Sequence, residues 1–589
     1  MKIVVLVKAV ADRSRLRRGS DGTAERTPTD SFLNPFDQRA LRVALDLRSA
    51  GDRGTVLSLG PPWAAALLAP LREAGFDEVR LLSDEALAGS DLGSTARALA
   101  AAVRPLAPDL LLLGERATDS EVGALPAVLA GALGLPLVTH AARLERVDPA
   151  GALRVRTESD EASAEHALAV PCVISVGEKI AKPLKPPRVA PEQVDALVER
   201  MTLAELGLPS ERLGRVGTSW VAGESVDLAF PRAPELYSLA DARAAIAAAR
   251  SLATARRERF PSSLAAGAEN PSRGALAILL TGPEGGIDRR ILRVVPALRT
   301  WLPTRPLVGL WVGPGAGAPA DRPAGLSEIY EVRCTGPPVP SDTAARAVGR
   351  LVDERSGLDG IAFVDSDFAR DVAGRLAGER DLPLVTGVEY AREGPEGIGW
   401  WKESWGSTAL AEVRARRRWP LATIRTPRES RPPPDGPEAA RGRSLDGPLG
   451  TGGATTVSWS RRERPELGDV ETAPLLLVVG QGIGGPEAID RLASASARLD
   501  RAIAGTRRVV DAGWLPIDRQ VGLTGRSLAP EIAILLGVSG SPNHLIGLRR
   551  ARAIVAVNPD PAAPVFRVAD VGIVGRVDDV LPGLLTALG

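Results

Sequence analysis

Short apolar runs of strand length alternate with amphipathic stretches of helical period along most of the chain. The first run, KIVVLVKAV at 2–10, is continuous and rich in β-branched residues, which is typical of a buried strand in a parallel sheet. An amphipathic stretch follows at 33–51, with Asp37 placed to cap a helix and Gly51 placed to end it. Because this alternation continues, the sequence predicts an α/β fold with a doubly wound parallel sheet. Further strands are expected at 54–60, 78–84 and 108–114, with a helix at 64–75.

The same alternation starts again in the middle of the chain. The word LPLVT stands at 135–139 and again at 382–386, and a Pro-led apolar strand follows each copy, at Pro171 and at Pro420. A repeat of this kind indicates that one supersecondary unit is used twice. We therefore expect two tandem α/β units of one fold, each of about 200 residues. The strands of the second unit are expected at 274–282, 305–313 and 359–367.

Three segments connect or extend these units. The alternating segments at 135–176 predict an antiparallel ribbon attached to the first sheet. A Pro- and charge-rich arm runs from 179 to about 270, with helices expected near 192–206 and 239–257. The segment 428–456 is rich in Pro, Gly and charge, and it is expected to be a linker with little capacity to bury a core.

The last part of the chain, at 505–558, places loops rich in Gly, Thr, Ser, Asn and Arg between short apolar runs. Ligands of open α/β sheets bind at the carboxyl ends of the strands, where these loops are expected, so the layout predicts a site for a large phosphate-bearing cofactor. Ahead of it, a strand at 475–480 runs into GQGIGG, and Gly480, Gly482 and Gly485 fit the pattern GxGxxG. That signal is weak, because no clear second strand ends in an acidic residue about 20 residues further on.

A second loop with possible nucleotide chemistry follows the strand at 108–114. It reads GERATDSEVGAL and is expected to open a helix with Asp119 and Glu121 in or near the first turn. A phosphate or nucleotide can bind at such a helix N-terminus. Simple capping by Asp119 explains the same residues, so the local sequence leaves both interpretations open.

Composition limits the classes of function. The chain has 589 residues, which suggests roughly three to five domains. Its net charge of +1 provides no global field to recruit nucleic acid or an anionic membrane. Two Cys exclude a metal–thiolate cluster, and three scattered His argue against a His-based metal site. Since no stretch approaches about 18 consecutive apolar residues and the N-terminus lacks signal-peptide features, a cytoplasmic protein without membrane insertion is expected.

Taken together, these motifs resemble those of the electron-transfer flavoprotein family. The C-terminal part is similar to the FAD domain of the family's α subunit, on the words VDAGW, QVGLTGR, LAPEI, GVSGSPNHL and AVNPDPAAPVFRVADVGIVG. The N-terminal part is similar to the β subunit, on LVKAVAD, LNPFD, DLLLLGERATD and TLAELGL. Residues 274–427 resemble the α subunit's N-terminal domain. The chain thus resembles a β subunit fused ahead of an α subunit.

The resemblance implies a fold and a domain order. Two tandem doubly wound units of the adenine-nucleotide-hydrolase-like type are expected, followed by a Rossmann-like, DHS-type FAD-binding domain. The implied domains are a β-like domain with a C-terminal arm at 1–258, an α N-terminal-like domain at 274–427, a linker at 428–456 and the FAD-binding domain at 457–589.

The resemblance also implies the residues that hold FAD. Arg507 is expected near the flavin N5, where a cation favours anionic reduced forms. His544 is expected at the flavin C2 carbonyl, and Asn558 at the adenosine. The Thr side chains offer hydroxyls, and the Gly residues let the backbone approach closely. The implied set is Gln481, Gly482, Ile483, Thr506, Arg507, Val521, Gly522, Leu523, Thr524, Ser539, Gly540, Ser541, Pro542, Asn543, His544, Asn558 and Arg576.

Three of these positions depart from the family pattern. Leu523 stands where Gln is usual, Ile483 where Arg is usual, and Arg576 where a polar or acidic residue is usual. Each lost contact is expected to cost on the order of 1–2 kcal/mol if nothing compensates. We hypothesise that Arg576 restores positive charge at the diphosphate. Unchanged FAD affinity in Arg576→Ala would contradict this.

In the family, the β subunit holds a structural AMP, and in flavin-bifurcating relatives a second FAD takes its place. The resemblance puts Leu6 and Leu59 beside the base, and Arg116 stands where Gln is common. AMP is therefore expected with less support than FAD. The matching loop residues are Asn34, Pro35, Phe36, Asp37, Gly114, Arg116, Ala117 and Asp119.

The resemblance implies an electron carrier rather than an enzyme, taking electrons from a dehydrogenase and passing them to a quinone reductase or another acceptor. The family's partner loop matches 182–201, but the expected Lys run is missing there, so the usual dehydrogenase partner is in doubt. A flavin-bifurcating, NADH-oxidising protein would instead hold two FADs. A non-redox adenine-nucleotide-binding protein would show no flavin spectrum even after FAD is added.

Overall fold

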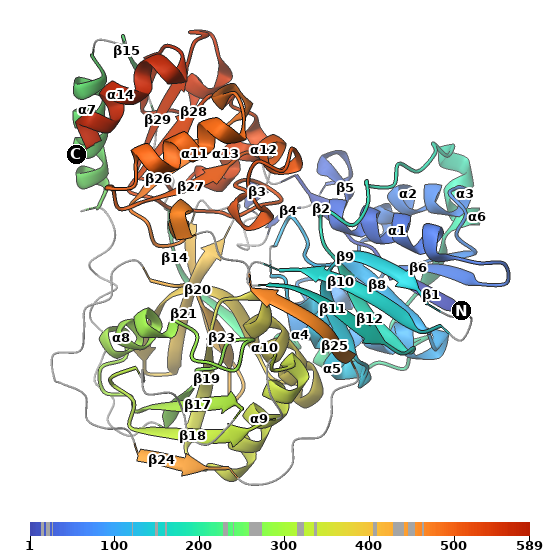
Figure 1. Cartoon of the computed structure of the whole chain (residues 1–589). Coiled ribbons are helices and arrows are strands. Elements are labelled where there is room, and N and C mark those ends of the chain that lie inside the picture. Colours follow the sequence, from blue (N-terminus) through green and yellow to red (C-terminus); the bar gives the residue numbers. More distant parts are fainter. Residues whose placement is uncertain are drawn as a thin grey trace. The chain divides into compact units, whose positions relative to one another are not determined.

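The computed structural model describes residues 1–12, 17–18, 24–25, 27–120, 122–147, 151–159, 162–227, 232, 234–238, 241–257, 274–314, 323–334, 338–404, 409–427, 441–445, 454–461 and 465–588. The chain folds into two compact units, whose elements are labelled in Figure 1. Unit 1 comprises Met1–Glu224, Gly267–Lys402 and Glu412–Arg462. Unit 2 comprises Ser225–Ala266, Glu403–Ala411 and Glu463–Gly589. Parallel strands form the centre of each large sheet, so the α/β expectation is confirmed.

The first sheet of unit 1 is centred on β1 (Lys2–Leu6), which pairs in parallel with β6 (Arg53–Leu59) and β8 (Leu110–Gly114). β7 (Glu78–Leu82) extends the sheet beyond β6, and β12 (Cys172–Val176) extends it beyond β8. Every residue of β8 and β12 is buried, as expected for strands covered by helices on both faces.

The predicted antiparallel ribbon is confirmed. β9 (Leu137–Arg146), β10 (Leu153–Glu158) and β11 (Ala162–Leu168) pair antiparallel in that order, and β9 also pairs in parallel with β12. β25 (Ala454–Arg461) pairs antiparallel with β11. The end of the segment expected to be a linker is therefore a strand of this sheet.

Two helix starts differ from the sequence prediction. α1 (Pro35–Leu47) has Asn34 at its N-cap, and Asp37 does not cap it, because both Asp37 carboxylate oxygens accept backbone N–H groups of Lys8 and Gly114. The chain leaves α1 at Arg48, before Gly51.

The helix after β8 is α5 (Leu125–Leu133), which begins well past Asp119. Asp119 instead accepts a hydrogen bond from Lys8 Nζ at 2.6 Å, so its expected capping role is wrong. Glu121 lies outside the described residues. The stretch predicted as one helix at 64–75 is divided by Pro70 into α2 (Ala65–Leu68) and α3 (Pro70–Glu73).

The second sheet of unit 1 repeats this plan. β16 (Ala275–Leu279) pairs in parallel with β17 (Leu307–Gly313) and β19 (Leu358–Val364). The sheet continues through β18 (Glu328–Arg333) beyond β17 and through β23 (Leu421–Ile424) beyond β19.

Both ends of the second sheet are extended. β20 (Leu384–Gly394) is parallel to β23 and antiparallel to β21 (Gly397–Ser404), and β22 (Ala409–Ala415) follows β21 in the strand order. At the other edge, β24 (Arg441–Ser444) pairs in parallel with β18. The described parts of the predicted linker therefore add strands to two sheets, because backbone pairing at a sheet edge needs no apolar side chains.

The two copies of the repeat pack through α5 and α10 (Asp367–Arg380). The two backbones approach so closely that a Cβ on Gly131 would lie 2.3 Å from the carbonyl oxygen of Arg375. A Cβ on Gly378 would lie 2.0 Å from the carbonyl oxygen of Val128. Glycine is therefore required at both positions by packing between helices, and each repeat supplies one side of the contact.

We expect Gly378→Ala to lower the free energy of unfolding by about 3 kcal/mol, because the added methyl overlaps backbone that cannot move alone. Urea unfolding of the full chain measures the change. Gly583→Ala in α14 (Val577–Leu588) is the control, since its Cβ meets only Ala242 at 3.8 Å. That control is expected to gain about 0.5–1 kcal/mol from helix propensity. A stabilised Gly378→Ala would contradict the close packing.

Unit 2 contains a six-stranded sheet in the order β15-β30-β29-β28-β26-β27, and every pair is parallel. The sequence shows no clear second strand after β26 (Leu475–Val479), but the structure has β27 (Arg501–Gly505), which is short and begins with a polar residue. It leads into Thr506 rather than an acidic residue. The remaining strands are β28 (Ile532–Leu536), β29 (Ala553–Asn558) and β30 (Val571–Val574).

The predicted arm divides between the units. Its first helix, expected near 192–206, is only the short α6 (Val194–Leu197), followed by β13 (Glu199–Met201) on the edge of the first sheet. The second, α7 (Ala242–Arg257), is confirmed and packs against α14 in unit 2. β15 (Glu235–Tyr237) adds a parallel strand to β30.

Two Arg of the arm anchor it within unit 2. Arg232 and Arg256 both form ion pairs with the buried carboxylate of Asp570, the latter at 2.9 Å. Asp570 also accepts the backbone N–H of Ile554 at 2.8 Å.

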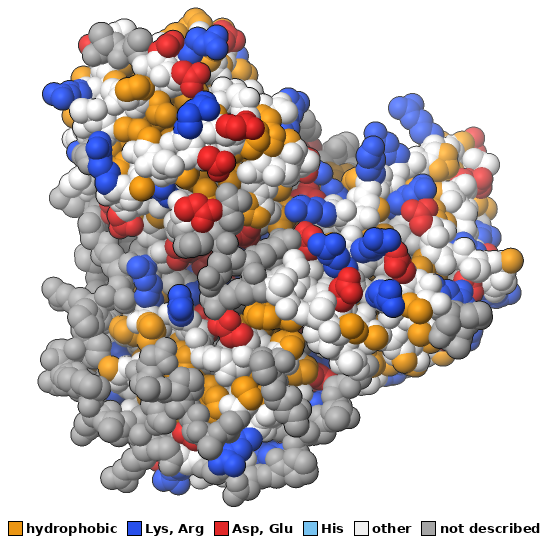
Figure 2. Space-filling view, viewed as in Figure 1, with side chains coloured by type: hydrophobic (Ala, Val, Ile, Leu, Met, Phe, Trp, Pro, Cys, Tyr) orange, Lys and Arg blue, Asp and Glu red, His pale blue; other side chains and the backbone are white. Residues whose placement is uncertain are grey.

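On the face shown in Figure 2, Lys and Arg are interspersed with Asp and Glu, in keeping with the net charge of +1.

Candidate functional site

The loops at the carboxyl ends of β26 and β28 meet at the point where the strand order of unit 2 reverses. β27 lies on one side of β26 and β28 on the other, so the switch point, where ligands of open α/β sheets bind, falls at the loops that follow β26 and β28. The backbone N–H of Gly480 donates to the carbonyl of Leu536 at 2.9 Å, and that of Gly482 donates to Gly537 at 3.1 Å. These bonds fix the two loops against each other.

The loop after β26 has room for backbone only. A Cβ on Gly480 would lie 2.2 Å from the Gly537 carbonyl oxygen, and one on Gly482 would lie 2.9 Å from the Gly537 Cα. Gly485 is the N-cap of α11 (Pro486–Ala495), and it supplies no side-chain cap. The N–H groups of this helix start are thus available to an anionic group. Gln481 and Gly482 are exposed, while Ile483 is buried.

His544 is the buried imidazole of this site. It lies in the short helix α13 (Pro542–Leu545), and its Nδ1 lies 2.8 Å from the carbonyl oxygen of Val521. Because a carbonyl only accepts, Nδ1 carries the proton. The Nε2 atom is buried and has no hydrogen-bond partner within the described part of the chain. Burial lowers the pKa of His544, so the ring is neutral and Nε2 is an acceptor.

The loop between β27 and β28 is held by its own residues and by α13. Gln520 donates through Nε2 to Thr524 Oγ1 at 2.9 Å, and the backbone N–H of Leu523 donates to the Asn543 carbonyl at 2.7 Å. Gly522, at a φ of 133°, lies against Asn543, whose carbonyl oxygen a Cβ would meet at 2.5 Å. Gln520 lies within the motif QVGLTGR, but the motif alone does not reveal that its side chain fixes Thr524.

Thr506 and Arg507 follow β27 directly. The Thr506 N–H donates to the Val479 carbonyl at 3.0 Å, and Thr506 is the N-cap of the five-residue α12 (Arg507–Asp511). The sequence shows only a loop here, because the helix is shorter than a periodic pattern can reveal. The Arg507 side chain is 47% exposed, with Nε 3.3 Å from Asp511 Oδ2.

The remaining predicted FAD residues divide into exposed and structural ones. Ser539 and Ser541 are exposed on the loop after β28, Pro542 and Asn543 are exposed at the start of α13, and Gly540 is buried against the Val565 backbone. Asn558 is used within the protein: its amide donates to the Val538 carbonyl at 3.0 Å and accepts the Asp560 N–H at 2.9 Å. Arg576 is exposed just before α14.

The predicted nucleotide loop of unit 1 forms a connected structure. Asn34 donates to the carbonyl of Arg116 at 2.9 Å and accepts the N–H of Thr118 at 3.3 Å, which joins the start of α1 to the loop after β8. Pro35 opens α1. The Arg116 guanidinium lies 5.3 Å from the centre of the buried Phe36 ring. Ala117 closes a turn to Ser120.

Asp37 lies at the centre of this structure, 6% exposed. A Cβ on Gly114 would lie 2.6 Å from the Asp37 carboxylate, so strand end and helix start are in direct contact. Burial raises the pKa of Asp37 to about 7, against the lowering effect of the Lys8 N–H. The polar side-chain atoms of Asn34 and Asp37 thus form hydrogen bonds within the chain. Fewer of them are available to a nucleotide than the sequence predicts. Leu6 is buried and Leu59 is half-buried nearby.

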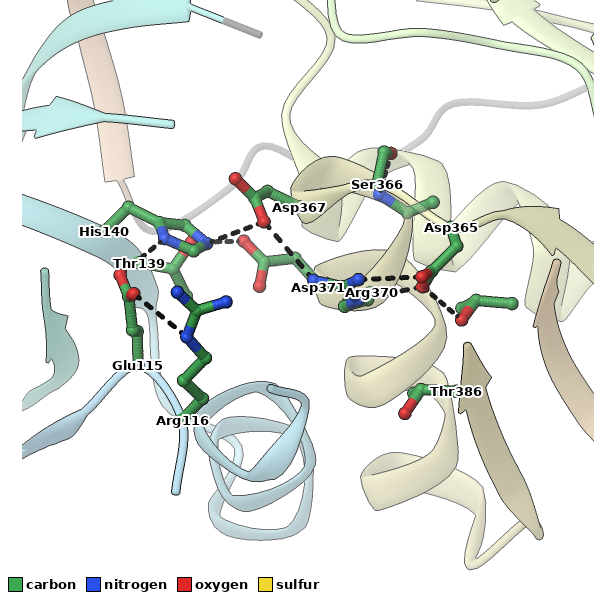
Figure 3. Close-up of polar contacts among 12 residues, drawn as sticks. Glu115, Arg116, Thr139, His140, Asp365, Ser366, Asp367, Arg370, Asp371 and Thr386 are labelled. Carbon is green, nitrogen blue, oxygen red and sulfur yellow. Dashed lines mark hydrogen bonds and ion pairs between the residues drawn. The ribbon is translucent and has the colours of Figure 1, made fainter. Parts of the chain in front are cut away.

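A charged cluster lies beside this loop, between the two repeats of unit 1 (Figure 3). His140 in β9 lies between Glu115, with Nδ1 3.0 Å from Oε2, and Asp367 of α10, with Nε2 3.5 Å from Oδ1. Thr139 donates to Asp371 at 2.5 Å. Thr386 donates to the carbonyl of Val122 at 3.1 Å. The Thr that ends each LPLVT copy therefore reaches across to the other copy, a contact the repeat could not reveal.

The sheet of unit 2, with glycine loops at its switch point, is that of the Rossmann-like nucleotide-binding proteins. Comparison with known proteins narrows this class. The Electron transfer flavoprotein domain matches residues 22–202, and the Electron transfer flavoprotein FAD-binding domain matches residues 469–549. The chain belongs to the electron transfer flavoprotein family.

Curated relatives agree with this assignment. The electron transfer flavoprotein subunit alpha of Mycobacterium tuberculosis (strain ATCC 25618 / H37Rv) is 29% identical over 316 residues, which cover 53% of this chain and 97% of the relative. The mitochondrial subunit alpha of Oryza sativa subsp. japonica is 31% identical over 249 residues, covering 41% of this chain and 67% of the relative. The mitochondrial subunit alpha of Arabidopsis thaliana is 42% identical over 126 residues, which cover 21% of this chain and 34% of the relative.

The residues of the unit 2 site fit FAD. The glycine loops and the start of α11 suit a diphosphate, and the buried Nε2 of His544 suits a polar edge of a ring system. Both lie within or next to the matched domain. In the part of the chain that the structure describes, no helix is long and apolar enough to cross a membrane.

Proposed function

We propose that this chain is a single-chain, FAD-containing electron carrier, with a β-like part at 1–258 fused ahead of an α-like part at 274–589. The order of the two matched domains supports the fusion, because the first precedes the second in one chain. The observation that carries the cofactor proposal is the buried Nε2 of His544, which has no hydrogen-bond partner among the described residues and lies within the matched FAD-binding domain.

In this proposal the residues of unit 2 bind and orient the cofactor. Gly480 and Gly482 let backbone approach the diphosphate, and the start of α11 stabilises its charge. Thr524 is oriented by Gln520, and His544 by the Val521 carbonyl. Bound FAD supplies reversible electron transfer. The exposed Arg507 provides a positive charge at the site. The half-buried Leu523 has no polar side chain to bond the cofactor, and its backbone N–H donates to the Asn543 carbonyl.

The donor is proposed to be a dehydrogenase and the acceptor a quinone reductase or another redox protein. The family membership supports carrier chemistry. AMP at the unit 1 loop receives no support from the comparisons, and the internal use of Asn34 and Asp37 argues against a strong nucleotide contact there.

Absorption of the purified chain, followed by chromatography of the nucleotides released on denaturation, tests the proposal. One FAD per chain is expected. Two FAD per chain would point to a bifurcating protein. Absence of flavin, even after incubation with FAD, would overturn the proposal in favour of a non-redox nucleotide-binding protein.

The hydrogen bond from His544 to the flavin C2 carbonyl requires a protonated ring, because Nδ1 already donates to Val521. Since burial lowers the pKa of His544, the proton must be taken up with FAD. We therefore expect the FAD dissociation constant to rise with pH, by up to about tenfold per unit, starting at a pH below the ordinary imidazole pKa of about 6.5. Fluorescence titration of the flavin-free chain measures it.

His544→Asn is the matched control for this titration. Its amide can replace the Nδ1 bond to Val521 but does not titrate, so its FAD affinity is expected to be independent of pH. A pH-independent affinity in the original chain would show that His544 stays neutral and accepts a hydrogen bond from the cofactor.

A further inference from the structure

Three Arg converge on one carboxylate on the surface of unit 1. Asp381, at the C-cap of α10, forms an ion pair with each of them. They are Arg97 of α4 (Leu92–Val103), Arg212, and Arg417 after β22. The Arg212 and Arg417 contacts to Oδ2 measure 2.5 and 2.9 Å. One negative charge cannot neutralise three guanidinium groups, so an excess of two positive charges remains at this point.

The surroundings add charge and apolar surface. Arg416 and Arg418, on either side of Arg417, are exposed. Val216 is 74% exposed, the largest exposure among the large hydrophobic residues that the structure describes. We call Arg97, Arg212, Val216, Arg416, Arg417 and Arg418 the Asp381 surface. The nearby carboxylate of Asp91, which accepts the backbone N–H groups of Ser94 and Ser219, offsets one positive charge and leaves the five Arg of the surface in excess.

A small cavity of about 30 Å³ opens within this surface at the start of α4, lined by Asp91, Gly93, Arg97 and Asp381 among others. The Nε of Arg97 is buried and has no hydrogen-bond partner among the described residues. A buried N–H of a guanidinium is costly to leave unsatisfied, and a cavity of this size has room for one water-sized acceptor.

The surface is held rigid before any partner arrives. The Arg215 N–H donates to the Ala88 carbonyl at 2.9 Å, and Gly217 donates to Leu213 at 2.8 Å. Arg416 donates through Nη1 to the Val216 carbonyl at 3.3 Å. Because the backbone around Val216 is already ordered, docking there costs little conformational entropy.

We propose that the Asp381 surface docks an acidic face of a partner protein, with partner carboxylates at the exposed Arg212 and Arg418 and an apolar partner side chain on Val216. The inference rests on the proposed carrier function, because a carrier must bind its redox partners transiently. It also gives a basic docking surface to a chain whose 182–201 segment lacks the Lys run expected there. Charge complementarity of this kind raises association rates and weakens with salt.

The test uses the full flavin-loaded chain and a fluorescein-labelled Glu-rich peptide with one central Leu. Binding by anisotropy is expected at low salt and is expected to weaken at least tenfold as ionic strength rises from about 0.01 to 0.15 M. The double variant Arg212→Gln/Arg418→Gln is expected to bind the peptide at least about tenfold more weakly. Val216→Ser is expected to weaken binding without changing the salt dependence.

Arg154→Gln/Arg289→Gln is the matched control, since both side chains are exposed on unit 1 and the net charge changes equally. Equal weakening in both double variants would overturn the proposal, because net charge alone would then explain binding. Tighter binding of a single-stranded oligonucleotide of equal charge would also overturn it. Flavin absorption of the same samples tests the carrier proposal separately. A chain that holds flavin but does not bind the peptide contradicts the docking proposal alone.

Discussion

Gly480→Ala is expected to yield a folded chain that no longer retains flavin. The new methyl would lie 2.2 Å from the Gly537 carbonyl oxygen and 2.8 Å from the Val538 Cα, so the loops after β26 and β28 must separate. These are the two loops that meet at the switch point, where the proposed diphosphate site lies. We expect FAD affinity to fall at least about 100-fold, since displacement by an ångström disrupts several contacts together.

Flavin absorption after gel filtration and titration of the stripped protein measure this loss. Gly282→Ala is the control, because Gly282 lies in the loop that follows β16 in the second sheet of unit 1 and its Cβ would meet only Asp288, at 3.8 Å. Circular dichroism shows whether both variants keep their fold. A folded Gly480→Ala chain with normal FAD affinity would place the cofactor elsewhere.

The sequence reveals the repeated α/β architecture because each buried strand is a continuous apolar run. β8 and β12 are buried at every residue, and their words DLLLLG and PCVISV carry that signal directly. β27 is missed, since five residues that begin with Arg give no such pattern. The helix starts are also misplaced, because capping rules consider only local partners. Asp37 is instead held by backbone groups from β8 and from the residues after β1.

In the candidate site, too, some features can be predicted from the sequence and others need the structure. The motifs predict His544 and the glycine loops as site residues, because their residue types suit the chemistry. They do not identify what orients them: the Val521 carbonyl fixes the His544 proton, and Gln520 fixes Thr524. Nor does the sequence show that Asn558 is bonded at both ends of its amide within the protein. Such roles depend on which loops meet, and that is decided by strand order.

His140 is the clearest case of a residue whose role needs the structure. It has a φ of 56°, in the left-handed region that disfavours most side chains. In the other repeat the residue after LPLVT is Gly387, with a φ of 70°. The fold thus requires this backbone conformation in both copies, and only the first places an imidazole there. The strain is retained because the ring joins Glu115 to Asp367 across the two repeats.

This geometry predicts that stability declines at alkaline pH. Burial acts to lower the pKa of His140, but the charges of Asp367 and Glu115 outweigh it and raise the pKa to about 10. The folded pKa exceeds the unfolded value of about 6.5, so the stabilisation is complete below pH 6.5 and is lost as pH rises through 10. The shift corresponds to about 5 kcal/mol across that window. Asp371 also faces the ring, and burial raises its pKa to about 6, so its effect falls at lower pH.

Urea unfolding of the full chain between pH 6.5 and 10 measures this loss. His140→Asn tolerates the left-handed backbone but carries no charge, so it is expected to be less stable at pH 6.5 and to show a flatter pH dependence. His166→Asn is the control, because burial lowers the pKa of His166 and its charge change lies below this window. Parallel pH profiles in His140→Asn and the original chain would mean that the ring is neutral, and that the two repeats are held by packing of α5 against α10 rather than by charge.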